Sequence, residues 1–278
     1  MDDVTNRSWG EWLRWAVWRV PRRLRHGRTV VRWWCVNAVN AVRLWWELRV
    51  QRRPISDITR YERHLYSQNG EDGILEALFA VIGTTNQYFV EFGASDAKEC
   101  NARYLAQHRG WRGLWMDADC DHPHRAVRRE TVTAENVEAL FARYGVPRTF
   151  DLLSIDIDGN DYWVWRAITA YEPRVVVIEY NAMVPLQESR VIPYDPLFRW
   201  DANTDFFGAS LLALQRLGAQ KGYALVGCDR SGTNAFFVRR TLIPGRLLLQ
   251  DVAAVYRRSM CFNGRGFPHN RQHQMVQV

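Results

Sequence analysis

From residue 88 onward, short apolar runs rich in β-branched and aromatic residues alternate with segments of helical pattern. Continuous apolar strands that are separated by helices predict a parallel sheet with helices on both faces. The expected strands are 88–94, 113–118, 131–133, 151–157, 174–180, 223–228 and 234–239. The expected helices are 71–82, 98–108, 122–129, 135–144, 161–170 and 208–221.

The connection between the last two expected strands fixes the direction of the final one. Only residues 229–233 separate these strands. So short a link forces a hairpin, and the final strand must run antiparallel to its neighbour. Five strand–helix units, a sixth strand and an antiparallel seventh predict an α/β fold with a Rossmann-like seven-stranded sheet. We place this domain at residues 54–240, followed by a C-terminal tail at 241–278 whose end, 263–278, we expect to be mobile.

Residues 1–53 hold all of the excess positive charge. The whole chain has a formal net charge of +7. This segment contains 12 Arg and four acidic residues, a charge of +8, so the remaining residues together carry −1. A nucleic-acid enzyme more often carries its positive charge around the active site, and the neutral body therefore disfavours nucleic acid as a partner.

The same segment contains eight of the 13 tryptophans, interleaved with arginine. Pro21 and Gly27 divide it into two expected helices, 8–20 and 29–50. Tryptophan and arginine are typical of a helix at a membrane surface, where indole rings lie at the headgroup level and guanidinium groups contact anionic phosphate. Helices that pack on the body or on a second copy of the chain have the same composition. An anionic membrane surface and a homo-oligomer therefore both stay open as partners of residues 1–53.

Cysteine usage and the N-terminus indicate the cytoplasm. The five cysteines are scattered and form no CxxC pair, which argues against a zinc site and suits a reducing compartment. The N-terminus starts acidic and lacks a clean apolar core, so no secretory signal is expected. Polar residues interrupt the longest apolar stretch, 29–50, and a spanning helix is not expected. We expect a cytoplasmic protein that is peripheral at the inner membrane face if residues 1–53 bind lipid.

The first two expected strands end in residues that suit a nucleoside ligand, and ligands of such sheets bind at the carboxyl ends of the strands. In VEFGASD, Gly93 lets the backbone approach a ligand, and Glu91 and Asp96 flank it. One glycine does not make the three-glycine dinucleotide fingerprint, whereas acids suit a ligand with a cationic amino-acid moiety. Asp117 follows about 20 residues after the glycine loop, where a carboxylate accepts hydrogen bonds from a ribose diol. A tight structural turn and a solvated strand-end Asp are the alternatives.

The third expected strand leads into a capped helix. Thr133 is a good helix cap, and Asn136 lies at capping-box distance. In nucleoside-binding sheets this turn borders the base, so Ala134 and Glu135 are expected beside it. A plain capped helix start is equally consistent with these residues.

Three carboxylates stand close together in SIDIDGNDYW, at Asp156, Asp158 and Asp161. In a calcium loop that starts at Asp156, glycine should occupy position six and glutamate position twelve. Asp161 and Ala167 occupy these positions, so the calcium-loop interpretation fails. Asp161 is instead placed to stabilise the N-terminus of the next helix.

The fourth and fifth expected strands bring oxygen donors to one rim of the sheet. Asp156 and Asp158 end the fourth strand, and Glu179 and Asn181 end the fifth. Such a set predicts a Mg²⁺ site, a general-base cluster that deprotonates a hydroxyl, or a structural cluster. Crowded carboxylates should also raise one another's pKa.

Several motifs recur in a fixed order along residues 60–240: YSQNGEDGIL (66–75), YFVEFGASD (88–96), GWRGLWMDAD (110–119), TAEN (133–136), DLLSIDIDGND (151–161) and VVIEYNA (176–182). Together they resemble FkbM-like S-adenosylmethionine-dependent methyltransferases, in the bacterial branch with a Ser-Gln-x-Gly-Glu-Asp segment. The family's glycine loop often reads Gly-Ala-x-Asp-Gly, whereas here Ala97 follows Asp96 and gives a stiffer turn.

The resemblance implies a class I methyltransferase fold, S-adenosylmethionine as the methyl donor and transfer to a hydroxyl. It implies that Glu91 and Gly93 hold the methionine part of the cofactor, that Asp117 holds the ribose, and that Ala134 and Glu135 border the adenine. Asp156 would lie nearest the sulfonium. The residues that would cap the cofactor from the preceding helix are Ser67, Gln68, Glu71 and Asp72. By spacing alone, Ser67 also suits a simple cap of helix 71–82.

The expected function is O-methylation of a sugar or of another small-molecule or glycan acceptor. Asp158 or Glu179 is expected to act as the base or to hold a Mg²⁺ ion, and Asn181 to orient the acceptor. The alternative is a catalytically silent methyltransferase-like protein that docks through its N-terminal helices.

The long link at 182–207 is rich in proline, aromatic residues and aspartate. Links of this length inside a compact domain are usually functional, so we expect an acceptor lid here. Tyr194, Trp200 and Asp201 are the candidate acceptor contacts, with plain surface packing as the alternative.

Overall fold

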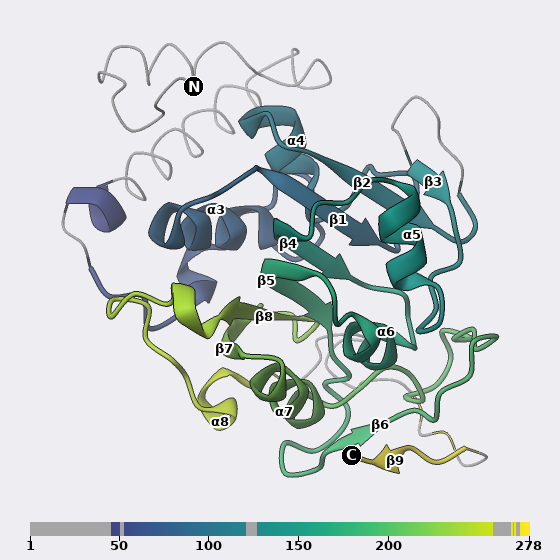
Figure 1. The fold of residues 1–278 in the computed structure, drawn as a ribbon. Coiled ribbons are helices and arrows are strands. Elements are labelled where there is room, and N and C mark those ends of the chain that lie inside the picture. Colours follow the sequence, from purple (N-terminus) through teal and green to yellow (C-terminus); the bar gives the residue numbers. More distant parts are fainter. Residues whose placement is uncertain (1–45, 51–52, 121–126, 258–267, 269, 271–272) are drawn as a thin grey trace, which may run out of the picture. The chain divides into compact units, whose positions relative to one another are not determined.

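The computed structural model describes residues 46–50, 53–120, 127–257, 268, 270 and 273–278 (Figure 1). The chain divides between Arg53 and Pro54 into two units. The expectations for the Trp/Arg segment lie almost wholly outside the described residues, which include only the short π-helical turn η3 (Trp46–Val50) from its helical part. In the described part of the chain, no helix combines the length and the apolarity that crossing a membrane requires.

Seven strands of the second unit form one sheet in the order β3-β2-β1-β4-β5-β8-β7. They are β1 (Tyr88–Phe92), β2 (Arg112–Asp117), β3 (Val127–Arg129), β4 (Thr149–Ile155), β5 (Glu172–Glu179), β7 (Tyr223–Cys228) and β8 (Asn234–Arg239). β8 pairs antiparallel with β5 and β7, and the pairs among β1 to β5 are all parallel. This is the Rossmann-like sheet of class I methyltransferases, and the expected fold class is confirmed.

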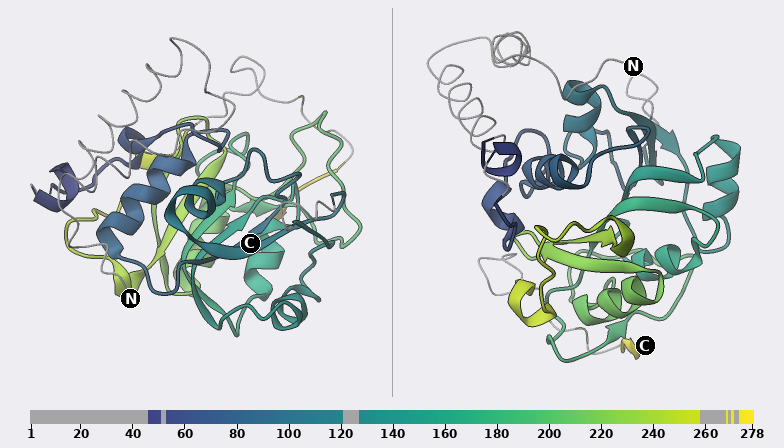
Figure 2. Two further views of the ribbon diagram at one scale, coloured as in Figure 1. Left: turned by 90° about the horizontal axis from the view of Figure 1, so that it is seen from above. Right: turned by 60° about the vertical axis from the view of Figure 1, so that its left-hand side comes forward.

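Helices cover both faces of the sheet (Figures 1 and 2). The described helices of this unit are η4 (Ile58–Tyr61), α3 (Glu71–Ile82), α4 (Arg103–Arg109), α5 (Val137–Arg143), α6 (Asp161–Ala167), α7 (Leu211–Gln220), η6 (Arg240–Leu242) and α8 (Val252–Val255). The cover explains the continuous apolar runs, because every residue of β4 from Phe150 to Ile155 is buried. Aromatic rings form part of the layer contacts. Trp165 of α6 lies 4.9 Å from Phe237 of β8, and Phe141 of α5 lies 5.9 Å from Phe92 of β1, measured between ring centroids.

The third strand was predicted in the wrong place. It comprises Val127–Arg129 instead of 131–133, and the described end of the expected helix 122–129 is therefore strand. Val127 pairs with Trp115 of β2, and this edge supplies the backbone hydrogen bonds that a helix would have made internally. The helical pattern of the segment does not reveal the neighbouring strand edge.

A second, two-stranded sheet was not predicted. β6 (Arg190–Val191) lies in the 182–207 link and pairs antiparallel with β9 (Val276–Gln277). The backbone N–H of Val278 also donates to the Ser189 carbonyl at 3.0 Å. The described end of the tail, expected to be mobile, is thus hydrogen-bonded to the expected lid.

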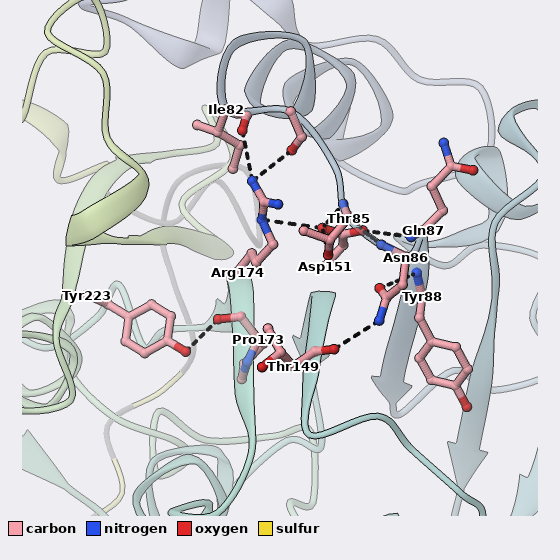
Figure 3. A network of polar contacts seen from close by, with 11 residues as sticks. Ile82, Thr85, Asn86, Gln87, Tyr88, Thr149, Asp151, Pro173, Arg174 and Tyr223 are labelled. Atoms are coloured by element: carbon pink, nitrogen blue, oxygen red, sulfur yellow. Dashed lines mark hydrogen bonds and ion pairs between the residues drawn. The ribbon is translucent and has the colours of Figure 1, made fainter. Parts of the chain in front are cut away.

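A buried polar network fixes the amino ends of β1, β4 and β5 (Figure 3). Asp151 is fully buried, and its carboxylate accepts hydrogen bonds from the backbone N–H groups of Thr85, Asn86 and Gln87 at 2.7 to 3.1 Å. Arg174 lies 3.4 Å from the same carboxylate and donates to the Ile82 and Gly83 carbonyls. The network ties the end of α3 to the sheet, at the edge opposite to the strands' carboxyl ends.

Candidate functional site

A cavity of about 870 Å³ opens at the carboxyl ends of β1, β2, β4 and β5. Its volume lies in the range of small-molecule pockets, and ligands of open parallel sheets bind at this edge. Among the sequence candidates, the lining residues are Gln68, Gly93, Asp117, Asp156, Asp158, Glu179 and Trp200. Residues from four strand ends and from the 182–207 link therefore face one space.

Gly93 stands where the loops after β1 and β4 cross. Its φ is +70°, and a Cβ added there would lie 1.6 Å from the Asp156 carbonyl oxygen. Only a residue without a side chain fits both the left-handed backbone and the close approach. The glycine thus sets the position of Asp156 in the cavity wall.

The backbone of the turn that follows Gly93 is strained, as expected from Ala97 at a position where the family often has glycine. Ser95 and Ala97 have φ of 47° and 53°, in the left-handed region that favours glycine. Asp117 holds this turn, because its Oδ2 accepts the Ser95 N–H at 2.8 Å. Its Oδ1 accepts the N–H groups of Asp119 and Cys120, both at 2.9 Å. A carboxylate offers about four lone-pair sites, so Asp117 keeps acceptor capacity for a ligand.

Asp156, Asp158 and Glu179 form a carboxylate cluster. One oxygen from each lies within 4.8 Å of the others. Burial, and then the charge of Asp158, raise the pKa of Asp156 well above its usual value. Burial and the nearby charge of Asp117 raise the pKa of Asp158, whose φ of 56° holds it in the left-handed region. Strained residues and raised carboxyl pKa values are both typical of functional sites.

Asp161 fixes the turn that carries Asp158 of this cluster. It is fully buried at the first position of α6 and accepts the N–H groups of Ile157 at 2.9 Å and Gly159 at 2.8 Å. Burial raises its pKa to about 6. Its oxygens therefore hold the turn that carries Asp158, in addition to lying at the start of the helix.

Asn181 does not join the cluster, contrary to its expected role. It is fully buried, and its Nδ2 donates to the Asp205 and Phe207 carbonyls at 2.8 and 2.9 Å. Its Oδ1 accepts the Met183 N–H at 2.9 Å. The side chain holds the two ends of the 182–207 link together and offers no oxygen to the cavity.

Glu91 and Asp96 also lie outside the cavity wall. Glu91 is buried and accepts hydrogen bonds from the backbone N–H groups of Asn101 and Ala102 and from the indole of Trp115, at 2.6 to 3.0 Å. Asp96 forms an ion pair with Lys98. These acids organise the segment between β1 and α4. Neither carboxylate lines the cavity, so they are not placed for the expected contact with the methionine part of a cofactor.

The Ser-Gln-x-Gly-Glu-Asp segment is mainly a structural cap of α3. Asp72 is fully buried, and its Oδ2 accepts the N–H groups of Leu65, Tyr66 and Ser67 at 2.6 to 3.0 Å. Ser67 Oγ in turn accepts the Asp72 N–H at 3.0 Å. Glu71 accepts a hydrogen bond from Asn234 of β8 at 2.8 Å. From this segment, the cavity is lined by Gln68 and its neighbour Asn69.

Ala134 and Glu135 contact the link instead of the cavity. Tyr194 Oη donates to the Glu135 carboxylate and accepts the Ala134 N–H at 3.2 Å. The wall at this position is formed by Glu130, Thr131 and Val132, which the sequence interpretation missed. The earlier position of β3 explains the difference, because it moves the strand end by a few residues toward the N-terminus.

The 182–207 link forms part of the cavity wall, and we refer to this link as the lid. Residues 196–200 line the cavity. Trp163 Nε1 donates to the Ile192 carbonyl at 2.9 Å, and Asn160 Nδ2 donates to the Asp195 carbonyl at 2.7 Å. Of the candidate acceptor contacts, Trp200 reaches the cavity, Tyr194 fastens the lid to Glu135, and Asp201 is exposed and accepts the Asn203 N–H.

Comparison with protein-family models gives no match, and neither does comparison with curated proteins. Among solved structures, the chain is similar to the one titled "Crystal structure of TnmH". The two share 13% sequence identity with a TM-score of 0.33, over 76% of this chain and 70% of that chain. The fold is assigned from the strand order of the sheet.

Proposed function

We propose that the chain is an S-adenosylmethionine-dependent methyltransferase that acts on a hydroxyl group of a small-molecule or glycan acceptor. One observation carries the proposal: Asp117 and the carboxylate cluster face the same cavity, at the carboxyl edge of a sheet with methyltransferase strand order. The resemblance of the ordered motifs to FkbM-like methyltransferases supports the same reaction. The competing dinucleotide chemistry is disfavoured, because a single-glycine turn and an acidic wall do not suit a pyrophosphate.

The cavity fits this methyl donor in size and charge. Among the described residues, six carboxylates line it: Asp117, Asp119, Glu130, Asp156, Asp158 and Glu179. They favour a ligand with cationic sulfonium and ammonium groups. Asp117 would accept the ribose hydroxyls, the wall at Thr131 and Val132 would border the base, and the turn at Gly93 would lie against the methionine part.

When bound, the cofactor would supply a methyl group on a positively charged sulfur. The sulfur is already a good leaving group for transfer of that methyl. The protein must then align the acceptor oxygen and remove its proton. Asp158 is the best-placed base, because it is exposed in the cavity and its raised pKa brings it closer to neutral pH. Asp156 is more deeply placed and has the stronger upward pKa shift, so it would accept a hydrogen bond or hold a proton beside the reacting oxygen.

A metal-assisted version uses the same cluster. One oxygen from each of the three carboxylates lies within 4.8 Å of the others, so these side chains are close enough together to hold one divalent cation. Asp156, Asp158 and Glu179 would then hold Mg²⁺, which lowers the pKa of a coordinated hydroxyl. Asn181 would not contribute, because its side chain is fully buried and does not line the cavity.

The test is a calorimetric titration of the full chain with S-adenosylmethionine, once with Mg²⁺ and once with a chelator. We expect micromolar binding that is lost in Asp117→Ala. Asp96→Ala is the matched control, because it removes an acid from the neighbouring turn that does not face the cavity and should bind normally. Binding that weakens with chelator and in Glu179→Gln would support the metal-assisted version. If neither S-adenosylmethionine nor its demethylated product binds under either condition, the proposal is wrong.

A further inference from the structure

The charges around the cavity are distributed unevenly. Against the six carboxylates that line it, Arg199 is the only lysine or arginine among the described lining residues. It comes from the lid, whereas the carboxylates come from the sheet and the loops that follow its strands. The lid therefore contributes the basic group of a described lining whose other charged residues are all acidic.

Among the described residues, Arg199 has one ion-pair partner, which it can exchange. Its Nη1 lies 2.9 Å from Oδ2 and 3.2 Å from Oδ1 of Asp119. Both side chains are largely in water, with exposed fractions of 68% and 71%. An ion pair this exposed contributes little net free energy, because water and salt compete with it. A ligand anion that reaches Arg199 can therefore replace the Asp119 carboxylate at small cost.

The backbone on both sides of Arg199 is held in place. Asn160 donates to the Asp195 carbonyl, and the indole of Trp200 donates to the Thr204 carbonyl at 2.9 Å. Phe198 packs against the β4–α6 turn, where a Cβ on Gly159 would lie 2.5 Å from its ring. The guanidinium is thus presented from a fixed lid segment while it remains in water, which is the arrangement of a binding group rather than of a packed surface residue.

The neighbouring lid residues add an apolar surface. Leu197 lines the cavity with 86% of its surface exposed, and Trp200, which follows Arg199 in the sequence, lines the cavity too. A ligand that contacts this part of the lid meets one cation flanked by apolar and aromatic side chains. A purely polyhydroxylic acceptor would use neither the charge nor the exposed leucine.

We infer that Arg199 is a specificity-determining residue that binds an anionic group on the acceptor, a phosphate monoester or a carboxylate, next to an apolar or aromatic part. A guanidinium binds either group through two parallel hydrogen bonds. In the absence of the acceptor, Asp119 takes the place of that anion. The inference rests on the proposed function for the identity of the ligand as the acceptor, but the anion site can be tested without the methyl donor.

The experiment measures binding of phenyl phosphate, benzoate and neutral benzyl alcohol to the full chain by ligand-observed NMR at 150 mM salt. Comparison of phenyl phosphate with benzoate shows which anion is preferred. We expect both anions to bind more tightly than benzyl alcohol. In Arg199→Gln the anions should bind about tenfold more weakly, the usual scale for loss of one charge-assisted pair, with benzyl alcohol unchanged.

A substitution of Asp119 distinguishes anion binding by Arg199 from a purely structural role of the Arg199–Asp119 ion pair. Asp119→Asn removes the internal competitor and should tighten anion binding about threefold, opposite to Arg199→Gln. If the ion pair only fastened the lid, both variants would change binding in the same direction. Arg190→Gln is the charge-matched control, because Arg190 is on the same lid, pairs with Glu188 and does not line the cavity.

Equal binding of the anions and benzyl alcohol to the wild type, or parallel effects of Arg199→Gln and Asp119→Asn, would overturn the inference. Failure of the proposed function is a separate result. If S-adenosylmethionine does not bind but the anion probes respond as expected, Arg199 remains an anion site and the methyltransferase proposal fails. If S-adenosylmethionine binds normally to Arg199→Gln while anion binding is lost, both hold.

Discussion

Replacement of Gly93 by alanine tests the crossing on which the candidate site is built. The new Cβ would lie 1.6 Å from the Asp156 carbonyl oxygen, and real Cβ contacts below 3.0 Å are essentially never seen. The loops after β1 and β4 would have to move apart until that gap reached at least 3.0 Å. The left-handed φ of +70° adds about 1 kcal/mol for any L side chain, and forced overpacking adds about 2 kcal/mol.

We therefore expect Gly93→Ala to lower the free energy of unfolding by about 3 kcal/mol, or the melting temperature by about 6 to 12 °C for a domain of this size. Gly110→Ala is the matched control. Gly110 has a φ of +73°, but no atom of the described residues lies within 4 Å of its added Cβ, so only the backbone cost of about 1 kcal/mol remains. Urea and thermal unfolding measure both values.

Because the displaced carbonyl belongs to Asp156, Gly93→Ala should also weaken S-adenosylmethionine binding by more than tenfold, whereas Gly110→Ala should bind normally. Calorimetry on samples shown to be folded at the working temperature separates the two effects. Equal destabilisation by the two substitutions would refute the reasoning, because it would mean that the loops after β1 and β4 do not cross as closely as described.

Three further expectations follow from the same structure. Asp151→Asn should lower the free energy of unfolding in urea by about 3 kcal/mol, because it leaves the buried Arg174 without its carboxylate. Glu172→Gln breaks a partly exposed pair with Arg239 and should lower it by less than about 1 kcal/mol. Similar losses for the two substitutions would contradict the buried network. Burial raises the pKa of Asp229 from 3.8 to about 6, so its stabilising contribution is complete below pH 4 and declines as the pH rises through 6. The cost of Asp229→Asn in urea unfolding should accordingly be larger at pH 4 than at pH 7.5, and a cost that grows with pH would reverse the sign of the argument. Deletion of residues 274–278 removes β9 from the lid and should raise the KM for the acceptor severalfold with unchanged S-adenosylmethionine affinity in calorimetry; an equal loss of both would show that the tail supports the whole domain.

Most strands of the sheet could be predicted, because a buried strand requires a run of apolar residues that is visible in the sequence. Residues 223–228 and 234–239 form strands with the bounds expected from their apolar runs, and α3 begins and ends at the expected residues. The short link between β7 and β8 fixed the antiparallel direction by chain geometry alone. β3 was misplaced because one buried residue, Val127, carries too little pattern to show an edge strand.

The candidate site was predictable only in part. Gly93, Asp117, Asp156, Asp158 and Glu179 were found because the carboxyl ends of parallel strands must share one edge. Glu91 and Asn181 lie at or next to strand ends, and Asp72 lies in α3, yet the oxygens of all three accept hydrogen bonds from nearby backbone N–H groups. Spacing cannot separate these cases, because whether an oxygen remains available depends on which N–H groups the folded chain brings to it.

By itself, the sequence determined the alternation of elements, the direction of β8 and the gathering of acids at one edge of the sheet. The tertiary structure alone decided which acids face the cavity, how the lid is fastened and that Arg199 of the lid pairs with Asp119 at the cavity. The physical reason is the range of the interactions. Burial and turn formation are encoded within a few neighbouring residues, whereas hydrogen-bond partners and opposing charges come from segments far apart along the chain.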